Sequence, residues 1–420
     1  MVNLTSFIFN TDQLNIPVFL ASKILKASTG QKTTTRPVVT IAITGIALGV
    51  MAMLLSVMVV TGFRNEISDK VTGFMTHLRI HKFDANNSFE DSPISDQQPF
   101  LNKLRHTPGV KKVQAFANKA CILKSKQEIQ GIVLKGVSND YDWTFFEKKI
   151  IEGHVPLFGN ETSNDVIISK NLAQKLQLKL NDSFLVFFIQ KDRKVRKLHI
   201  TGIYNTGLSE EFDNIYLLCD LRLIRQVNNW KPDEVGGFEV QFNDFSQLEK
   251  LSPVVYSIVG YQLNVQTIKE LNPQIFNWLE LQNLNVWVII SLITLVAGIT
   301  MISTLLIIVL ENSRQIGLLK ALGADDKLIS TTFSYISLKI LFKGLLIGNI
   351  AGLGLAFLQL QFGFISLPEE SYYLTKVPIN FTLTGFLLIN AGTIFVCLLM
   401  MLIPSRIIAK INTIKVLRFD

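Results

Sequence analysis

The sequence predicts an α-helical membrane protein with four transmembrane helices and a large extracytoplasmic α+β domain between the first and second helices. Three observations predict this fold class: two long segments without any charge, a segment of balanced charge between them, and two further apolar stretches near the end. The chain of 420 residues is 48% hydrophobic and 18% charged. Its length would allow two or three soluble domains, but the apolar residues are too unevenly distributed for that.

The apolar stretches are long enough to cross a bilayer. Residues 38–60 and 286–310 hold no charged side chain. At about 1.5 Å per residue they form helices of roughly 34 and 37 Å, against a hydrocarbon core of about 30 Å. We expect a third transmembrane helix at 340–365 and a fourth at 382–404. The first stretch begins too late, and is too long, for a cleaved signal peptide.

The net charge of +8 is concentrated beside these stretches. Residues 61–285 hold 27 Lys and Arg against 26 Asp and Glu, so the excess cations flank the apolar segments. Because cytoplasmic loops are enriched in Lys and Arg, both termini and the 311–333 segment are expected in the cytoplasm. Residues 61–285 and the 366–380 loop are then expected on the opposite side. The same pattern excludes a basic nucleic-acid-binding surface.

The two ends of the chain are expected to be short cytoplasmic segments. Residues 1–37 precede the first span, and residues 405–420 form a tail after the last one. Within the first segment, residues 14–28 are typical of an amphipathic helix with a basic end, lying on the inner face of the membrane. A loosely ordered tail is the alternative.

The 61–285 segment has the pattern of a folded α+β domain. Alternating apolar residues predict strands at 76–81, 130–137, 182–190, 197–204 and 236–242. Helical patterns fall at 96–105, 169–177, 220–228 and 244–257. This order suggests a sheet covered on one face by helices. A helix over 267–285 would run into the second span as a stalk, with Pro273 in its first turn or at a kink.

Glycines recur at every fourth residue in two of the spans, a spacing that lets helix backbones approach closely. The third span is expected to pack within the chain, whereas the first could pack within the chain or against a second chain. The packing positions are Gly344, Gly348 and Gly352 in the third span and Gly45 and Gly49 in the first.

Known catalytic and metal-binding patterns are missing. The sequence contains no G-x-x-x-x-G-K-[ST] phosphate loop, no H-E-x-x-H and no G-x-S-x-G. His77 and His81 share one face of a predicted strand without a third ligand, so no metal site is predicted. Cys121 and Cys219 both fall in the outer domain, where a disulfide or two buried free thiols are possible. Cys397 lies in the fourth span.

The 311–329 segment, ENSRQIGLLKALGADDKLI, predicts two helices directly after the second span. Asn312 would cap the first helix together with Gln315. Gly323 suits a left-handed ending, and Asp325 would cap the second helix. The first helix would carry an apolar stripe at Ile316, Leu319 and Leu322. A soluble partner could hold this stripe in a groove and approach the backbone at Gly317, or the segment could be an ordinary interfacial loop.

Residues 316–324, IGLLKALGA, resemble the IGxLKALGA signature of the permease family that includes the MacB, FtsX and lipoprotein-releasing (Lol) proteins. The tail at 404–420 is similar to that family's ending. Two stretches resemble the Lol branch: SVMVVTGF at 56–63, and the loop with Tyr372-Tyr373-Leu374 and Pro378. In this family the 311–333 region is a coupling segment, whose helix docks on an ATP-binding-cassette ATPase. The resemblance implies docking residues at Arg314, Gln315, Ile316, Gly317, Leu319, Lys320, Leu322 and Gly323.

The resemblance also implies a function. The expected protein is a permease subunit of an ABC complex in the bacterial inner membrane, with a dimer of ATPase subunits and a second permease, identical or homologous. It would extract lipoproteins from the outer leaflet of that membrane. ATP and Mg would be bound by the partner ATPase, with no cofactor, metal or catalytic residue on this chain. Lipid chains would lie between the first two spans, facing Met53, Val57, Val60, Phe63, Trp287 and Ile290.

Several points stay open from the sequence. Lol permeases recruit a periplasmic carrier through an extended hairpin, but the corresponding 187–200 segment here is a short charged turn, so direct carrier docking is undecided. A MacB-like efflux subunit or an FtsX-like mechanotransmission subunit is the alternative within the family. A membrane receptor with an outer ligand-binding domain is an alternative from another class, as is a membrane-anchored enzyme.

Overall fold

The computed structural model describes residues 16–27, 35–83, 89–125, 128–159, 161–188, 194–208 and 212–409. They form two compact units, each built from several chain segments: 1–62, 280–364 and 379–420 in the first, and 63–279 and 365–378 in the second. We call them the membrane unit and the outer unit. Residues 1–15, the 410–420 end of the predicted tail and the middle of the 187–200 turn lie outside the described residues.

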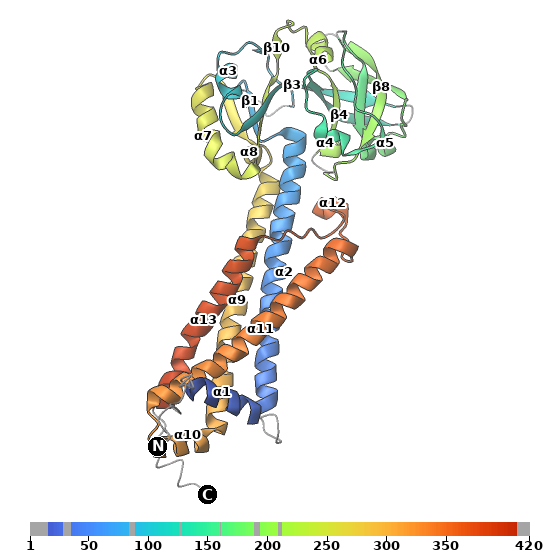
Figure 1. The fold of residues 1–420 in the computed structure, drawn as a ribbon. Helices are drawn as coiled ribbons and strands as arrows, with labels where there is room; N and C mark the ends of the chain where they lie inside the picture. The colour runs from blue at the N-terminus through green and yellow to red at the C-terminus, as the bar shows by residue number, and fades with distance from the viewer. Residues whose placement is uncertain are drawn as a thin grey trace, which may run out of the picture. The chain divides into compact units, whose positions relative to one another are not determined.

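Within the described chain, four helices are long and apolar enough to cross a membrane. They are α2 (Thr35–Met75), α9 (Pro273–Glu311), α11 (Asp326–Phe362) and α13 (Leu383–Ala409) (Figure 1). The first two are 41 and 39 residues long, which is well beyond the roughly 20 residues that span a bilayer. The predicted class, four membrane-crossing helices with a large α+β domain after the first, is confirmed.

The helix after the outer domain starts later than expected. The predicted 267–285 stalk divides into α8 (Ile268–Leu271) and α9, with Asn272 between them in a non-helical conformation. Pro273 is the first residue of α9. A proline disfavours helical geometry in the residue before it, but its fixed φ suits the first helical position. One helix from residue 267 was therefore wrong, and Pro273 marks its true start.

The third membrane helix begins within the 311–333 segment and continues without a break. The Asp325 carboxylate accepts a hydrogen bond from the Leu328 backbone N–H at 2.9 Å, as the sequence predicts for a cap. From there α11 continues for 37 residues to Phe362, about 55 Å at 1.5 Å per residue. Gly363 ends it in the left-handed conformation, with φ +59. The predicted surface helix and third span are thus one element.

The membrane unit packs through small residues on its helices. A Cβ placed on Gly348 would lie 2.6 Å from the Ala47 carbonyl oxygen, and one on Gly344 would lie 2.7 Å from Ile46 Cγ2. These glycines therefore let α11 lie directly against α2. On another part of α2, a Cβ on Gly49 would lie 2.9 Å from Ile293 of α9. The remaining two sites have more room: Gly352 faces Leu54 and Met51 of α2 at 3.4 Å, and Gly45 faces Thr300 at 3.9 Å.

The outer unit is built on a mixed sheet of ten strands, in the order β12-β1-β11-β3-β4-β9-β6-β8-β5, with β7 pairing with β3 and β8. A second, two-stranded sheet pairs β10 with β2. The strands are β1 (Leu78–His81), β2 (Ile94–Ser95), β3 (Val110–Lys124), β4 (Ile129–Val137), β5 (Ile150–Gly153), β6 (Asp165–Ser169), β7 (Ser183–Phe188), β8 (Lys194–Tyr204), β9 (Tyr216–Asp220), β10 (Glu234–Val235), β11 (Gly237–Phe242) and β12 (Asn264–Thr267).

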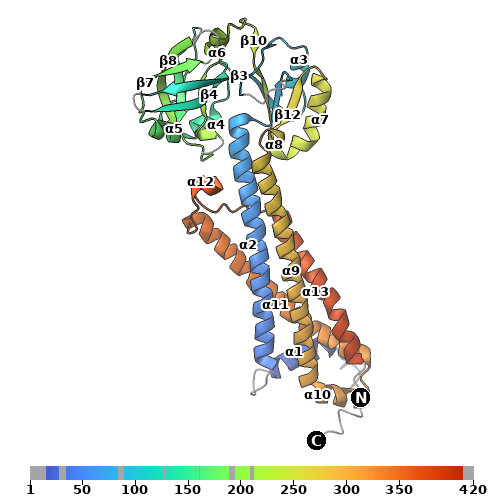
Figure 2. The ribbon, with the colours of Figure 1, turned by 180° about the vertical axis from the view of Figure 1, so that it is seen from behind.

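Strand β3 joins the two halves of this sheet. Its first part pairs with β11 and its second part with β4 and β7. Figures 1 and 2 show α3 and α7 beside β1 and β12, and α4, α5 and α6 around β4 and β8. The shorter helices are α3 (Phe100–Arg105), α4 (Thr144–Glu147), α5 (Lys170–Lys175), α6 (Leu221–Asn228), α7 (Leu248–Val259) and α12 (Glu369–Tyr372), with the 3-10 turn η2 (Phe245–Gln247).

All five predicted strands and all four predicted helices of this domain have a counterpart within a few residues. The longest strand, β3, was not predicted from the sequence, because lysines at 111, 112, 119 and 124 interrupt its apolar pattern. The structure accommodates Lys119, which is almost fully buried, through an ion pair with Glu90 at 3.0 Å. A buried strand with paired charges cannot be recognised from hydropathy alone.

The two outer-domain cysteines are buried free thiols. Cys121 on β3 is paired with Ile132 of β4, and Cys219 on β9 with Gly136 of the same strand. Four residues along a strand is about 13 Å, and β4 lies between the two cysteines. A disulfide needs Cα atoms within about 7 Å, so the disulfide alternative is wrong. Burial raises the pKa of both thiols well above the ordinary range.

Candidate functional site: the coupling segment and the outer cleft

The segment between the second and third membrane helices forms α10 (Ser313–Ala321). Asn312 occupies its N-cap position, but no side-chain capping hydrogen bond forms there. The Asn312 side-chain amide instead donates to the Ile308 carbonyl of α9 at 2.7 Å. The predicted capping pair of Asn312 and Gln315 was therefore wrong. The Asn312 side chain bonds to the last turn of α9 instead of capping the start of α10.

The end of α10 has a defined stop. Gly323 has φ +97, and its N–H donates to the Lys320 carbonyl at 3.0 Å. The Ala324 N–H donates to the Leu319 carbonyl at 2.9 Å. These two bonds make the Schellman ending that a left-handed glycine permits. An ion pair between Lys320 and Asp326, with Nζ and Oδ1 2.8 Å apart, joins α10 to the start of α11. The segment is a short helix held at both ends.

The predicted apolar stripe does not lie on one open face. Ile316 is only 2% exposed, and Gly317 is also buried within the chain. Leu322 is 78% exposed, and Leu318, which is not part of the predicted stripe, is 58% exposed. Three-residue spacing placed Ile316 and Leu322 on one stripe, but the helix ends at Ala321 and the chain turns before Leu322 can continue the buried face.

The buried face of α10 is covered by the chain itself. Ile316 belongs to the apolar cluster of the membrane unit, together with Ala21 of α1 (Ile16–Ala27) and Phe333 of α11. Ala21 is fully buried, and Ile24 packs against the same cluster. The amphipathic helix predicted at 14–28 is thus present over 16–27, with its apolar face against α10 and α11.

A second chain can therefore reach only the other face of α10. Its exposed residues include Arg314, Gln315 and Leu318, followed by Leu322 and Gly323 in the turn. Leu319 and Lys320 are half-buried. Of the eight predicted docking residues, the structure leaves four exposed and buries Ile316 and Gly317. The docking role itself stays a prediction.

The six residues predicted to face lipid are not brought together. Met53 is 1% exposed, and its sulfur accepts a hydrogen bond from Thr294 of α9 at 3.4 Å. Met53 therefore lies where α2 and α9 pack against each other, and its contact with lipid stays a prediction. Trp287 is 62% exposed, whereas Val57, Val60 and Ile290 are half-buried. Phe63 belongs to the outer unit and stacks edge-on against Trp278 at 6.2 Å.

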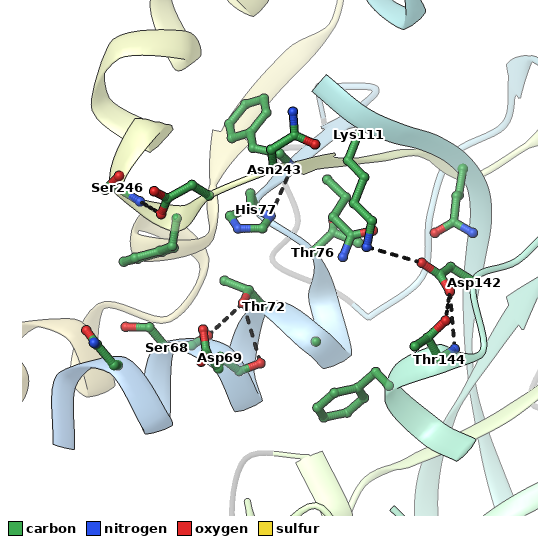
Figure 3. Close-up of a pocket in the computed structure, with 18 of the residues that line it drawn as sticks. Ser68, Asp69, Thr72, Thr76, His77, Lys111, Asp142, Thr144, Asn243 and Ser246 are labelled. Atoms are coloured by element: carbon green, nitrogen blue, oxygen red, sulfur yellow. Dashed lines mark hydrogen bonds and ion pairs between the residues drawn. The ribbon is translucent and has the colours of Figure 1, made fainter. Parts of the chain in front are cut away.

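The outer unit contains a cleft of about 660 Å³ that the sequence did not reveal. One wall is a polar face of α2 that includes Ser68, Asp69 and Thr72, as Figure 3 shows. The other walls come from the end of β11, from β3 and from the residues around α4. A helical face of Arg64, Asn65, Ser68, Asp69, Thr72 and Thr76 directly after a membrane span was the available sequence signal. The cleft combines cations, carboxylates and hydroxyls.

His77 is one of the residues that line this cleft. Its Nδ1 accepts a hydrogen bond from the Phe242 backbone N–H at 3.2 Å, so Nε2 carries the proton of the neutral ring. Burial lowers the pKa of His77 to about 4, which keeps the ring neutral at pH 7. On the opposite wall, Lys111 pairs with Asp142 at 3.6 Å. The Thr144 side chain and backbone N–H donate to Asp142, and these bonds lower the pKa of that carboxyl.

The described cleft residues provide hydrogen-bond donors and acceptors, and both cationic and anionic side chains, but no activated nucleophile. Ser68 lies on α2, and no described group forms a hydrogen bond with its buried hydroxyl. Across the described residues, no three His, Cys, Asp or Glu side chains gather as a metal site would require. Such a cleft can bind a polar or zwitterionic segment, whereas its lining offers no constellation for covalent catalysis.

A buried ion pair anchors α2 in the sheet of the outer unit. Lys135 of β4 and Glu239 of β11 approach to 2.8 Å, and each side chain is at most 4% exposed. The Lys135 ammonium also donates to the Phe74 carbonyl, in the last turn of α2, at 2.7 Å. Burial lowers the pKa of Lys135 and raises that of Glu239, while their mutual attraction opposes both shifts. The end of the first membrane helix is thus fixed to the outer core.

These features define a class: a multi-pass membrane protein whose first two membrane helices continue into a folded outer domain, with a short helix held between the second and third. The profile of the MacB-like periplasmic core domain matches residues 39–254, and that of the FtsX-like permease C-terminal region matches residues 287–413. The first match covers half of the chain. The chain therefore belongs to the family of FtsX-like permeases with a MacB-like periplasmic core domain.

Several curated proteins are similar over nearly their whole length. The lipoprotein-releasing system transmembrane protein LolE of Haemophilus influenzae is 21% identical over 398 residues, covering 89% of this chain and 92% of that protein. The corresponding LolC protein of Buchnera aphidicola is 21% identical over 393 residues, covering 87% and 90%. Among solved structures, the periplasmic region of MacB from Actinobacillus actinomycetemcomitans is 14% identical with a TM-score of 0.33, covering 49% of this chain and 96% of that one.

Proposed function

We propose that this chain is the permease subunit of an ABC complex that releases lipoproteins from the outer leaflet of a bacterial inner membrane toward the outer membrane. Nucleotide hydrolysis takes place on a separate ATPase, which binds ATP and Mg, and this chain carries the resulting movement outward. The complex contains an ATPase dimer and a second permease, identical or homologous. Both termini and α10 are cytoplasmic, and residues 61–285 are periplasmic.

One observation carries this proposal: α10 is a short helix fixed at both ends between two membrane-crossing helices, with an exposed face for a partner. Its start is tied to α9 by Asn312, and its end is tied to α11 by the Lys320–Asp326 ion pair. A push on the exposed face is therefore passed to both helices rather than absorbed by a loop. The similarity to LolC and LolE proteins supports lipoproteins as the cargo.

The cargo explains why imported energy is needed. Withdrawing a lipid chain from a bilayer costs about 0.8 kcal/mol per CH₂, so a sixteen-carbon chain resists extraction by roughly 12 kcal/mol. A lipoprotein carries two or three such chains. No polar path through the bilayer is required for this task, because the cargo starts in the outer leaflet. This agrees with apolar spans that carry no charge over residues 38–60 and 286–310.

The lipid chains need an apolar place beside α2 and α9. Within this chain the two helices are closely packed at Gly49 and Met53, so cargo does not fit between them at that level. The exposed apolar face of α9, which includes Trp287 at 62% exposed, offers an alternative surface. With two permeases in the complex, cargo would lie between such faces of opposite subunits.

Co-purification tests the class of function. The full chain, extracted in detergent, is expected to co-elute with an ATP-binding-cassette ATPase. Leu318→Asp, at the exposed face of α10, is expected to reduce that association at least tenfold, because a charge replaces an apolar contact. Leu157→Asp, at a leucine that is 87% exposed in the outer unit, is the matched control and should leave it unchanged.

Depletion tests the cargo. Cells depleted of this protein are expected to retain lipoproteins in the inner membrane, as measured by fractionation. An unchanged distribution would overturn the assignment to lipoprotein release while leaving an ABC permease for other cargo, such as a MacB-like efflux subunit. A preparation free of any ATPase would overturn the whole class and favour a receptor.

A further inference from the structure

The loop between the third and fourth membrane helices is built into the outer unit. Residues 365–378 belong to that unit by their contacts, although α11 and α13 on either side belong to the membrane unit. The loop folds back on itself: the Leu367 N–H donates to the Thr375 carbonyl at 2.9 Å, and the Val377 N–H to the Ile365 carbonyl at 3.2 Å. Leu374 is 5% exposed within the apolar core of the outer unit. The loop is thus an ordered hairpin with a buried anchor.

One charged side chain of α2 holds the tip of this hairpin. The short helix α12 ends at Tyr372, and the next residue, Tyr373, has φ +59 and a backbone carbonyl that contacts α2. The Lys70 ammonium donates to this carbonyl at 2.6 Å, and Lys70 as a whole is only 9% exposed. Burying a cation without a hydrogen-bond partner costs free energy. The Tyr373 carbonyl supplies such a partner, so the contact favours this position of the hairpin.

A turn of the outer domain closes the same contact from a third side. Gly207 follows β8 and has φ +77. A Cβ on Gly207 would lie 2.5 Å from Lys70 Nζ, 2.5 Å from Glu369 Oε1 and 3.3 Å from the Tyr373 carbonyl oxygen. The turn is itself fixed, because the buried Asp213 carboxylate accepts hydrogen bonds from the backbone N–H groups of Thr206 and Gly207 at 3.1 and 3.2 Å. Lys70, the hairpin tip and this turn form one interlocked contact, which we call the clasp.

The clasp is connected to α10 by one continuous stretch of the chain. The chain runs from α10 through the Asp325 cap into α11, which is one unbroken helix of 37 residues. Gly363 ends that helix, and the hairpin begins at Ile365. A displacement of α10 therefore reaches the hairpin through a single helix. This path is separate from the one through α9 and α2.

We propose that Lys70 is a positioning residue for lipoprotein release: it couples the third and fourth membrane helices to the outer domain, so that nucleotide-driven movement of α10 reaches the outer domain through the hairpin. The inference rests on the proposed function. It predicts that loss of the clasp separates two quantities that the intact complex links, the rate of ATP hydrolysis and the number of lipoproteins released per ATP.

Two pairs of variants test the clasp in the full chain with its co-purified ATPase. Lys70→Met removes the donor but keeps a long side chain, whereas Lys70→Arg keeps a cationic donor. Gly207→Ala forces a methyl group into the clasp. Its matched control is Gly260→Ala, at φ +79 in the same unit, where a Cβ meets nothing within 4 Å. Both glycines have a similar positive φ, so both variants strain the backbone, and only Gly207→Ala places a methyl group against Lys70.

The functional measurement uses the complex in vesicles of phosphatidylethanolamine and phosphatidylglycerol that carry a triacylated lipoprotein. Lys70→Met and Gly207→Ala are expected to hydrolyse ATP within twofold of the wild-type rate but to release at least fivefold less lipoprotein per ATP. Lys70→Arg and Gly260→Ala are expected to keep at least half of the release. Normal release in Lys70→Met, or release and hydrolysis that fall in proportion, would overturn the proposal.

Hydrogen exchange of the same proteins separates this inference from the proposed function. In Lys70→Met the amides of Leu367 and Val377 should exchange at least tenfold faster than in the wild type. A non-hydrolysable ATP analogue should alter exchange at residues 205–208 in the wild type and not in Lys70→Met. If both results hold while the wild-type complex releases no lipoprotein, the cargo assignment fails and the coupling stands. If exchange in the hairpin is unchanged by Lys70→Met, the clasp is refuted.

Discussion

The membrane unit and the outer unit are held together by different means. The outer unit has a core of apolar side chains that also contains the buried ion pair Lys135–Glu239. In the membrane unit, α11 lies against α2 where Gly344 and Gly348 leave room for direct backbone contact. Removal of apolar surface from water drives the folding of the outer unit. Within lipid that driving force is missing, so helices associate through close packing and interhelical hydrogen bonds.

The comparison teaches where each unit tolerates change. In the outer unit, apolar burial from water stabilises the fold enough to offset the desolvation of buried charges. This holds as long as each charge keeps its partner. The membrane unit depends on the shape of a few contact points instead. Substitutions that remove a partner should therefore be most harmful in the outer unit, and substitutions that add volume should be most harmful in the membrane unit.

The largest expected effect is on the buried ion pair. Lys135→Met leaves the Glu239 carboxylate buried without its cation and the Phe74 carbonyl without its donor. We expect the free energy of unfolding to fall by about 3–5 kcal/mol. The measurement is chemical unfolding of the full protein, followed by the fluorescence of Trp143 and Trp230 in the outer unit. Lys269→Met, which breaks an exposed ion pair with Glu249, should change stability by less than about 1 kcal/mol.

Added volume in the membrane unit should have the next largest effect. Gly348→Leu places a side chain where the Ala47 carbonyl oxygen lies 2.6 Å from the Cβ position. The added side chain should force α11 away from α2 and lower the free energy of unfolding by about 3 kcal/mol, as overpacking does. Gly354→Leu lies on the same helix, and its Cβ meets nothing within 4 Å. The comparison fails if both variants lose the same stability in SDS-induced unfolding from mixed micelles.

Acid should weaken the outer unit through His77. Burial lowers the folded-state pKa of His77 to about 4, below its ordinary 6.5, so the unfolded chain binds the proton more readily. This contribution to stability is complete above pH 6.5 and is lost as the pH falls toward 4. Between pH 7 and 4.5 the loss should be about 2 kcal/mol.

The test of that loss compares unfolding curves of wild type and His77→Gln at the two pH values. The glutamine variant cannot titrate, so it should lose about 2 kcal/mol less than the wild type over the same range. Its carbonyl can accept the hydrogen bond from the Phe242 backbone that His77 now accepts. Equal losses in the two proteins would show that protonation of His77 does not cause the loss of stability in acid.

The smallest expected effect concerns a polar contact within the membrane unit. The side-chain amides of Asn349 on α11 and Asn390 on α13 exchange two hydrogen bonds, at 2.7 and 3.2 Å. A double-mutant cycle with leucine at both positions should give a coupling energy of about 1 kcal/mol, because such bonds in membranes are modest. A coupling as large as the Lys135 effect would contradict the view that shape dominates this unit.

Much of the architecture could be predicted from the residues. The spans follow from long uncharged runs, and the caps at Asp325 and Gly323 follow from local hydrogen bonding and backbone freedom. The candidate site was predictable only in part. Periodicity places Ile316 on an apolar face of α10, but it does not say that α1 of the same chain covers that face. The resemblance of residues 316–324 to a family signature drew attention to the segment, and the structure showed which side of it is open.

By itself, the sequence determined which segments cross the membrane, where the folded domain lies in the chain and roughly where the short helices of that domain lie. Those properties depend on the hydropathy, charge and local bonding of neighbouring residues. Only the tertiary structure decided that Cys121 and Cys219 cannot pair, that polar residues of α2 line a cleft, and that Lys70 meets Tyr373 more than 300 positions away. These outcomes depend on which distant segments share a neighbourhood, and no pattern along the chain specifies that.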